Sequence, residues 1–295
     1  MKRQFVVFAL AALAVGSACA QANDTVAKIK ASGKVVLGTR DSSAPLAYTL
    51  GDGKYVGYHV ELCERILKAI APGAKIEYVP VTSQNRIPLV QNGTVDIECG
   101  STTNNVARQK DAAFALTTYV TEVRTAVKAN SGINSIAQLN GKTVATTTGT
   151  TSVQHLRKNE RARGMEFKEV LGKDHSDSFL LLESGRADAM VMDDNILAGL
   201  IANAKNPKDF KIVGEVLSVE PIAIMFRKDD PKFKKAVDDE IRKEMKNGEL
   251  TKLYNKWFMS PIPPKNVNVN LPMGETLKGL IANPNDKPME DYAKK

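Results

Sequence analysis

The chain has 295 residues, of which 25% are charged, and a formal net charge of +8. This length suits two domains of ordinary size. Basic and acidic side chains are mixed along the chain, as between Lys232 and Glu240, which is typical of a solvated surface and argues against a nucleic-acid-binding stripe. Beyond the first residues, no segment is apolar for long enough to cross a bilayer.

The first twenty residues have the pattern of an export signal. Lys2 and Arg3 precede an apolar stretch from Phe5 to Val15, and small residues around Cys19 stand where a signal peptidase cleaves. We therefore expect a signal peptide over residues 1–20 and an exported mature chain. A buried N-terminal helix and a lipoprotein modified at Cys19 are the alternatives. Removal of the two basic residues lowers the formal charge from +8 to +6, a balance that still helps to attract a small anion.

The first part of the mature chain alternates strands and helices. The predicted elements are a strand at 35–38, a helix at 59–70, a strand at 76–81, a short helix with Ser83 as its N-cap that carries Arg86, and a helix that opens at 103–105 and carries Arg108. Such alternation predicts a parallel-rich sheet.

The second part repeats the alternation after the chain changes register near 118–123. The predicted elements are strands at 124–127, 141–145, 166–171, 187–192 and 222–226, helices at 152–160 and 175–183, and one long amphipathic helical stretch from 231 to 258. The tail after Pro261 is rich in Pro and Asn, and we expect it to wrap over a surface without a core of its own.

Two stretches, 83–101 and 177–193, share one pattern. Each reads as a short apolar helix stopped by a glycine, followed by an Asp and an apolar strand. Gly93 and Gly185 suit the left-handed position just past a helix end, where a side chain would be penalised. One such unit in each half predicts an α/β protein of two similar lobes with a site between them.

The lobes are expected to exchange the chain twice, near 118–123 and 217–222. Paired strands at these crossings would form a hinge that allows closure around a ligand. We accordingly assign 21–120 to the first part of lobe 1, 121–219 to lobe 2, and 220–295 to the second part of lobe 1 with the C-terminal tail.

Polar groups gather where the predicted strands end, which is the edge where open α/β sheets bind ligands. These groups are Arg40, Arg86, Ser101, Thr103, Arg108 and Asp193. A guanidinium matches a carboxylate with two parallel hydrogen bonds, and an aspartate supplies the charge that an ammonium needs. For a lone arginine a surface salt bridge is the simpler interpretation, but three at one edge favour an anion site because unpaired clustered cations are costly.

Other candidate groups fit the same interpretation. Thr151 follows Gly149 and Thr150 between a predicted strand and a helix, so backbone N–H groups at this helix start would favour an anion. His175 alone is more often a structural histidine than a ligand contact. The histidines show no metal-ligand spacing, and P-loop, G-x-G-x-x-G and G-x-S-x-G motifs are missing. We therefore expect no cofactor and no metal, although missing motifs do not exclude an enzyme.

Two cysteines remain in the mature chain, Cys63 in a predicted helix and Cys99 at a strand end of the same lobe. An oxidising compartment favours a disulfide, whereas two buried free thiols are equally compatible with the sequence. The geometry decides between them.

Over essentially the whole mature chain, the sequence resembles the glutamate/aspartate periplasmic binding proteins of bacterial ABC importers. The resemblance rests on Thr82-Ser83-Gln84-Asn85-Arg86-Ile87-Pro88-Leu89, Asp96-Ile97-Glu98-Cys99-Gly100-Ser101-Thr102-Thr103-Asn104-Asn105, Gly149-Thr150-Thr151-Ser152, Lys173-Asp174-His175, Met192-Asp193-Asp194, Trp257-Phe258 and Pro261-Ile262-Pro263-Pro264-Lys265-Asn266. It implies the type II periplasmic binding protein fold with two hinge strands.

The resemblance also implies a role for each matching residue. Arg108 and Thr151 would bind the α-carboxylate, Ser101 and Thr103 would bond the α-amino and α-carboxyl groups, and Asp193 would hold the α-ammonium. The side-chain carboxylate would be gripped by a second set, which consists of Arg40, Ser83, Arg86 and, as a further polar contact, His175. Cys63 is not part of this pattern.

These observations predict an exported, monomeric binding protein for L-glutamate or L-aspartate that hands its ligand to an inner-membrane ABC permease. Glutamine lacks the second negative charge and would leave Arg40 and Arg86 unsatisfied. Two alternatives stay open. An exported enzyme on the same fold, of the cyclohexadienyl dehydratase type that acts on prephenate or arogenate, would need an acid–base pair in the cleft. A sensor that feeds a receptor would bind the same ligand.

Overall fold

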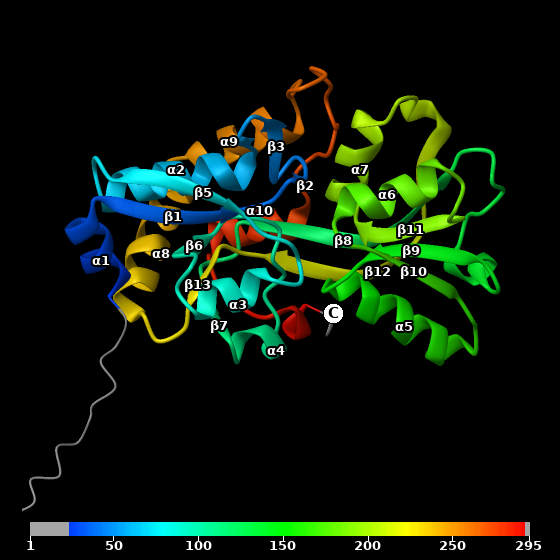
Figure 1. Cartoon of the computed structure of the whole chain (residues 1–295), viewed down its shortest axis with the longest axis horizontal. Helices are drawn as coiled ribbons and strands as arrows, with labels where there is room; N and C mark the ends of the chain where they lie inside the picture. Colours follow the sequence, from blue (N-terminus) through cyan, green and yellow to red (C-terminus); the bar gives the residue numbers. More distant parts are fainter. Residues whose placement is uncertain (1–23, 293–295) are drawn as a thin grey trace, which may run out of the picture.

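The computed structural model describes residues 24–292, so the predicted signal peptide and the alternative at Cys19 lie outside the described residues. Within this range the chain forms two five-stranded sheets flanked by helices, with a small three-stranded sheet beside the first (Figure 1). The strand orders are β5-β1-β6-β13-β7 and β10-β9-β11-β8-β12. In each sheet one strand, β13 or β8, runs antiparallel to its neighbours, and the others run parallel. The expected α/β fold of two mostly parallel sheets is confirmed.

The first sheet and its surrounding helices come from both ends of the chain. The strands are β1 (Lys34–Thr39), β5 (Lys75–Pro80), β6 (Ile97–Glu98), β7 (Ala112–Phe114) and β13 (Met225–Arg227). The helices are α1 (Thr25–Ser32), α2 (Tyr58–Ile70), α3 (Arg86–Gln91), α4 (Val106–Gln109), α8 (Pro231–Lys246), α9 (Glu249–Phe258) and α10 (Glu275–Ala282), with the 3-10 turn η3 (Met289–Asp291). The small sheet consists of β2 (Ser42–Ser43), β3 (Ala47–Gly51) and β4 (Lys54–Val56).

The second sheet is built from the middle of the chain. Its strands are β8 (Tyr119–Lys128), β9 (Thr143–Thr147), β10 (Lys168–Gly172), β11 (Ala189–Asp193) and β12 (Phe210–Ile222). Its helices are α5 (Thr151–Arg163), α6 (His175–Glu183) and α7 (Asp194–Asn203), with the 3-10 turns η1 (Ile136–Leu139) and η2 (Pro207–Asp209).

Two long strands connect the sheets, β8 on the way out and β12 on the way back (Figure 1). They pair antiparallel from Tyr119 opposite Ile222 to Lys128 opposite Phe210, with one irregularity in register. At the first-sheet end, Thr103 forms an isolated bridge with Ile222. The predicted crossings therefore lie on paired strands, which is the arrangement that a hinge requires. The residue boundaries assigned to the lobes stay a prediction.

The glycine-stopped helices of the repeated pattern are present in both halves. Gly93 and Gly185 have φ angles of 78° and 75°, the left-handed conformation that glycine adopts without penalty. In the second copy Asp174 forms a capping box with Asp177, which fixes the start of α6 at His175. The predicted helix at 175–183 therefore matches α6 at both ends.

Several local predictions were wrong. Asn85, not Ser83, is the N-cap of α3, so the helix begins two residues later than predicted. The stretch from 231 to 258 is two helices, since Gly248 adopts a left-handed φ of 76° between them. The tail carries a helix of its own, α10, whose Leu277 and Leu280 are buried. Leu277 joins the main core of the first lobe.

The two strands that connect the lobes, β8 and β12, were also predicted incompletely. β8 begins at Tyr119 and not at 124. The paired strand expected near 217–222 is the second half of β12, a strand of 13 residues whose first half, from Phe210, was not predicted. Helix α7 was not predicted either. β12 alternates poorly in polarity because most of its side chains are only half buried, so the period-2 signal of a strand is weak there.

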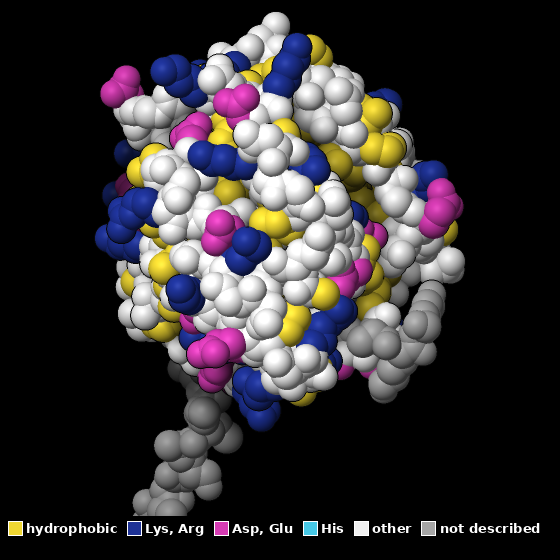
Figure 2. Space-filling view, turned by 90° about the vertical axis from the view of Figure 1, so that its right-hand side faces the viewer, with side chains coloured by type: hydrophobic (Ala, Val, Ile, Leu, Met, Phe, Trp, Pro, Cys, Tyr) yellow, Lys and Arg dark blue, Asp and Glu magenta, His cyan; other side chains and the backbone are white. Residues whose placement is uncertain are grey.

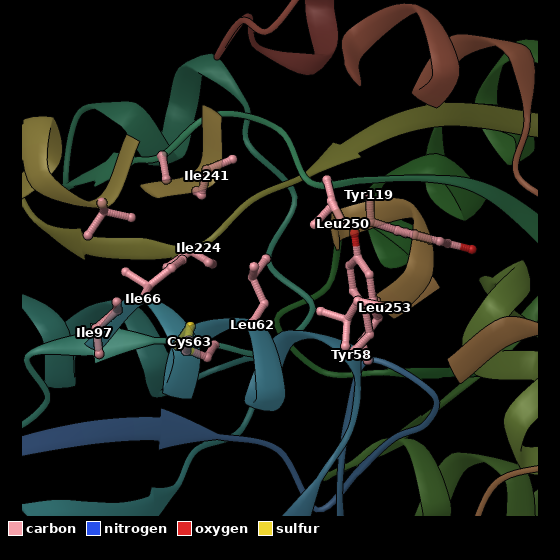
Figure 3. Packing of buried hydrophobic residues seen from close by; sticks show 14 of the residues in the cluster. Tyr58, Leu62, Cys63, Ile66, Ile97, Tyr119, Ile224, Ile241, Leu250 and Leu253 are labelled. Atoms are coloured by element: carbon pink, nitrogen blue, oxygen red, sulfur yellow. A yellow bond between two sulfur atoms is a disulfide. The ribbon is translucent and has the colours of Figure 1, made fainter. Parts of the chain in front are cut away.

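The largest core lies between the first sheet and helices α2, α8 and α9 (Figure 3). Tyr119 and Phe258 stack with ring centroids 4.9 Å apart, and Tyr254 stacks on Phe258 at 4.4 Å, so the start of β8 is held by aromatic contacts. Cys63 of α2 and Cys99 are joined by a disulfide inside this core. Both cysteines are fully buried, and the bridge fixes α2 to the segment that leads from β6 into the polar edge of the sheet.

The surface agrees with the mixed charge pattern of the sequence. Lysines, arginines and acidic residues are interspersed over the face at the far end of the second sheet, without a field of one sign (Figure 2). Among residues 24–292, no helix is long and apolar enough to span a membrane.

Candidate functional site

A small pocket lies between the two sheets, where strands of both end. It is nearly closed, with a cavity volume of about 10 Å³, far below the 300–1,000 Å³ typical of drug-sized ligands. Its lining is polar except for one methionine, and consists of Ser83, Arg86, Ser101, Thr103, Thr150, Thr151, His175, Met192 and Asp193. Seven of the nine residues predicted for the site are in this lining. The other two do not line the pocket but contact residues that do: Arg40 donates to the hydroxyl of Ser101, and Arg108 donates to the carbonyl of Thr103.

Arg40 follows β1 and is fully buried. Its guanidinium donates to Ser101 Oγ at 3.1 Å and to Asp174 Oδ1 at 2.7 Å. Asp174 belongs to the second lobe, and its other oxygen accepts a bond from Ser42 Oγ at 2.7 Å. Burial opposes ionisation of Asp174, but Arg40 and His175 outweigh it and lower its pKa to about 2. The charge of Arg40 is therefore already balanced by a carboxylate of the protein.

Arg86 begins α3 and is also buried. It donates to the carbonyl of Ser101 at 3.1 Å, but its Nε has no hydrogen-bond partner. The hydroxyl of Ser83, three residues earlier, is likewise buried without a partner. Burial, and next to it the charge of Arg108, lowers the pKa of the Arg86 guanidinium well below its ordinary value. Among the described residues no carboxylate lies within ion-pair distance of Arg86. The buried carboxylates of Glu98 and Asp193 offset only part of its charge.

Arg108 lies on α4 behind the same pocket. Asn105 caps this short helix by accepting from the backbone N–H of Arg108 at 2.8 Å. The guanidinium donates to the carbonyl of Thr103 at 3.0 Å and, across to the second lobe, to that of Gly149 at 3.3 Å. It too has no carboxylate partner within the part of the chain that the structure describes. Burial lowers its pKa, so Arg108 is a second cation that an anion would stabilise.

Gly149 stands where the two lobes meet. Its φ is +81°, and a Cβ there would lie 2.8 Å from the backbone of Gln84 in the other lobe. Only glycine allows this approach. Beyond it, Thr150 caps α5 through its side chain, which places Thr151 at the first turn of the helix and in the pocket lining.

Asp193 ends β11 and is buried at the pocket. Its side chain makes no hydrogen bond or ion pair to another described residue. Burial raises its pKa well above the ordinary value, and the neighbouring carboxylates Glu220 and Asp194 add to this. A cationic partner would relieve that cost, so Asp193 complements the two unpaired arginines with the opposite charge.

His175 connects the two lobes at the pocket wall. Its Nδ1 lies 3.0 Å from Thr147 Oγ1 and its Nε2 lies 3.2 Å from Arg40. Burial, followed by the charge of Arg40, lowers its pKa to about 3. At neutral pH the ring is therefore uncharged, and since Arg40 donates to Nε2, the proton is on Nδ1.

Three polar residues at the site escaped sequence reasoning. Asp174 pairs with Arg40, and Glu220 of β12 accepts from the hydroxyls of Thr103 at 2.6 Å and Thr151 at 2.8 Å. His155 lies 2.8 Å from the other oxygen of Glu220. Glu220 precedes Pro221 within the predicted crossing. An acidic residue in so apolar a stretch is the one sequence feature that could have indicated a buried polar role.

The pocket offers donors for anions and acceptors for a cation, without the clustered ligands of a metal site. Among residues 24–292 no group of three or more His, Cys, Asp or Glu side chains is placed to hold a metal ion. Among residues 24–292, Arg40 pairs with Asp174, whereas Arg86, Arg108 and Asp193 form no ion pair. The geometry suits a small molecule that carries both signs of charge.

Known proteins share both the sequence and the fold. The sequence pattern of the family described as "Bacterial extracellular solute-binding proteins, family 3" matches residues 35–260. The "Glutamate/aspartate import solute-binding protein" of Escherichia coli K12 is 45% identical over 291 residues, which cover 95% of this chain and 96% of that protein. The "L-glutamate/L-aspartate-binding protein" of Pseudomonas aeruginosa is 46% identical over 273 residues, 90% of each chain. A solved ancestral arginine-binding protein bound to arginine has a TM-score of 0.69 and 31% identity, over 77% of this chain and 98% of that one.

Proposed function

Because the chain belongs to family 3 of the bacterial extracellular solute-binding proteins, we propose that it binds L-glutamate and L-aspartate outside the cytoplasmic membrane and delivers them to an ABC permease for import. One observation carries the choice of ligand. Two buried guanidinium groups, Arg86 and Arg108, form no ion pair with any carboxylate of residues 24–292, and the pocket beside them holds Asp193, which forms none within that range either. Two cations and one anion are the complement of an acidic amino acid.

The proposed ligand would compensate each of these charges. Its α-carboxylate pairs with Arg108, its α-ammonium with Asp193, and its side-chain carboxylate with Arg86 and the free hydroxyl of Ser83. Charge-assisted hydrogen bonds of this kind contribute roughly 1.5–3 kcal/mol each. Arg40 and His175 support the side-chain end, with the charge of Arg40 shared with Asp174.

Closure of the two lobes is the proposed means of capture. Arg40 pairs with Asp174, and Arg108 with Gly149, across the cleft, while β8 and β12 provide the connection about which the lobes would move. We propose that the protein acts as a monomer in the periplasm after removal of residues 1–20. The name of the Escherichia coli relative describes a solute-binding protein for import, which supports transport over the dehydratase and sensor alternatives.

Isothermal titration calorimetry tests the proposal. The protein should first be unfolded and refolded, which removes ligand carried through purification, and then titrated with L-glutamate, L-aspartate and L-glutamine. We expect tight one-to-one binding of both acids and a much weaker response to glutamine, which cannot compensate Arg86. Equal binding of glutamine would contradict the role of Arg86. No binding of any of the three would reopen the enzyme interpretation.

A further inference from the structure

Glu220 lies beside the pocket without lining it. It stands on β12, opposite Thr121 of β8, where the two crossing strands pair. Its side chain is fully buried. Oε2 accepts hydrogen bonds from Thr103 Oγ1 at 2.6 Å and from Thr151 Oγ1 at 2.8 Å, and Oε1 lies 2.8 Å from His155 Nε2. One carboxylate thus contacts a pocket residue from each lobe.

This contact fixes the direction of two hydroxyl groups. A threonine hydroxyl has one proton to donate, and an ionised carboxylate can only accept. Burial opposes ionisation of Glu220, but His155 and the two hydroxyls outweigh it and hold its pKa below the ordinary value. Thr103 and Thr151 therefore direct their protons to Glu220, and only their oxygen lone pairs are left for the pocket.

Those lone pairs share the pocket with the carboxylate of Asp193. The two hydroxyl oxygens, which lie 3.5 Å from each other, therefore present only lone pairs. Asp193 adds acceptor oxygens once a neighbouring ammonium favours its ionised form. A primary ammonium carries three N–H donors, which matches three acceptor groups. Donor groups for a ligand carboxylate come from a different part of the lining, where Ser83 precedes α3 and Arg86 begins it.

We propose that Glu220 is a positioning residue that makes the pocket selective for a primary ammonium, by orienting the hydroxyls of Thr103 and Thr151 as acceptors. This inference rests on the proposed function and extends it. The hydroxyl oxygen of Thr151 is thereby assigned to the α-ammonium, while its backbone N–H, at the first position of α5, stays available for the α-carboxylate that the family resemblance implies. A dicarboxylate such as 2-oxoglutarate has an acceptor oxygen in place of the amine. Its keto oxygen would face the lone pairs of the two threonine hydroxyls without a proton between them, so we expect it to bind much more weakly.

The test compares L-glutamate with 2-oxoglutarate by calorimetry on the refolded mature protein. Glu220→Met removes the carboxylate at similar length and frees both hydroxyls to donate. Glu220→Gln keeps one acceptor oxygen and is the gentler change if the methionine variant folds poorly. Glu215→Gln is the matched control, since Glu215 lies on the same strand and pairs with Arg163 at the surface.

We expect the unmodified protein and Glu215→Gln to prefer L-glutamate strongly. In Glu220→Met the ratio of the two dissociation constants should fall by about tenfold or more, since reversing one charge-assisted contact is worth about 1.5–3 kcal/mol, with Glu220→Gln in between. A merely structural role would weaken both ligands alike and leave the ratio unchanged, and that result would overturn the inference.

The two proposals fail in different ways. If the unmodified protein binds both ligands equally well, the selectivity assigned to Glu220 is wrong while an anion site remains. If it binds neither ligand, the proposed function is wrong and this inference with it.

Discussion

In both lobes the fourth strand of the sheet order runs antiparallel to its neighbours, but the two lobes bring different charges to the pocket. The three arginines, Arg40, Arg86 and Arg108, belong to segments of the first sheet, whereas Asp174 and Asp193 belong to segments of the second. Where the lobes meet, Arg40 and Asp174 form an ion pair. The remaining charges are buried without a partner among residues 24–292, and burial of an unpaired charge is costly. The comparison indicates that contact between the lobes balances part of the charge and leaves the rest to the ligand.

Replacement of Arg86 should have the largest effect on this balance. In Arg86→Met, loss of the pairing with a ligand carboxylate in a buried site should weaken L-glutamate binding by about 3–5 kcal/mol. The ligand-free protein should become more stable, because a buried cation that is only partly compensated is removed. Calorimetry and thermal unfolding measure the two quantities. Arg157→Met is the control, since Arg157 pairs with Glu169 at the surface. Unchanged affinity would show that Arg86 does not carry the ligand charge.

Loss of the disulfide should change stability far more than binding. The bridge closes a loop of 36 residues inside the first-lobe core, and chain entropy predicts a loss of about 3–4 kcal/mol in the free energy of unfolding for the double variant Cys63→Ala, Cys99→Ala. Denaturant titration measures this loss. Reductant should destabilise the unmodified protein and leave the double variant unchanged. An equal stability of the two proteins would show that the bridge contributes nothing to the fold.

Acid should destabilise the first lobe through His59. This histidine is fully buried between Gly100 and Thr118, and burial lowers its pKa to about 4. Because the folded pKa lies below the unfolded value of about 6.5, the unfolded chain binds the extra proton. The stability is therefore complete above pH 6.5 and falls by about 1.4 kcal/mol per pH unit as the pH drops towards 4.

The variant His59→Asn should remove this contribution from the pH dependence. Its side-chain amide can still donate to the carbonyl of Gly100 and does not titrate. Urea titrations between pH 7 and pH 4 measure how the free energy of unfolding of each protein changes with pH. If the substitution leaves this pH dependence unchanged, His59 does not titrate in this window.

The cross-lobe pair should make the smallest contribution. Asp174 is partly exposed, so its bond to Arg40 is worth less than a fully buried pair. In Asp174→Asn, we expect L-glutamate binding to weaken by about 1–2 kcal/mol, since closure loses one charge-assisted bond. Asp239→Asn, which alters an exposed acid paired with Lys235, should leave the affinity unchanged. If Asp174→Asn weakens L-glutamate binding as much as Arg86→Met does, the distinction between Arg40, which is paired within the protein, and Arg86, which is left for the ligand, is wrong.

The site residues at strand ends could be predicted from the sequence, because the order of strands and helices determines the edge of the sheet at which they lie. Ser101 and Asp193 follow apolar strands, and the carboxyl ends of parallel strands meet at one edge. Seven of the nine residues predicted for the site line one pocket. Their individual roles stay predictions, because placement in a common pocket does not identify the group that each residue binds.

The missing parts depend on contacts that no local pattern encodes. Asp174 and Glu220 reach the site from the second lobe and from the crossing strand, so their partners are set by tertiary structure. The break at Gly248 could have been predicted, since a glycine in an amphipathic run often ends a helix. Helix α10 was hidden by the Pro and Asn residues around it, although Leu277 and Leu280 have helical spacing.

A crystal structure of the refolded protein with L-glutamate would show which charged groups of the pocket the ligand compensates. We expect the side-chain carboxylate on Arg86, the α-carboxylate on Arg108 and the ammonium on Asp193, with the bond between Arg40 and Asp174 intact. A ligand carboxylate that displaces Asp174 from Arg40 while Arg86 makes no contact with the ligand would contradict this expectation.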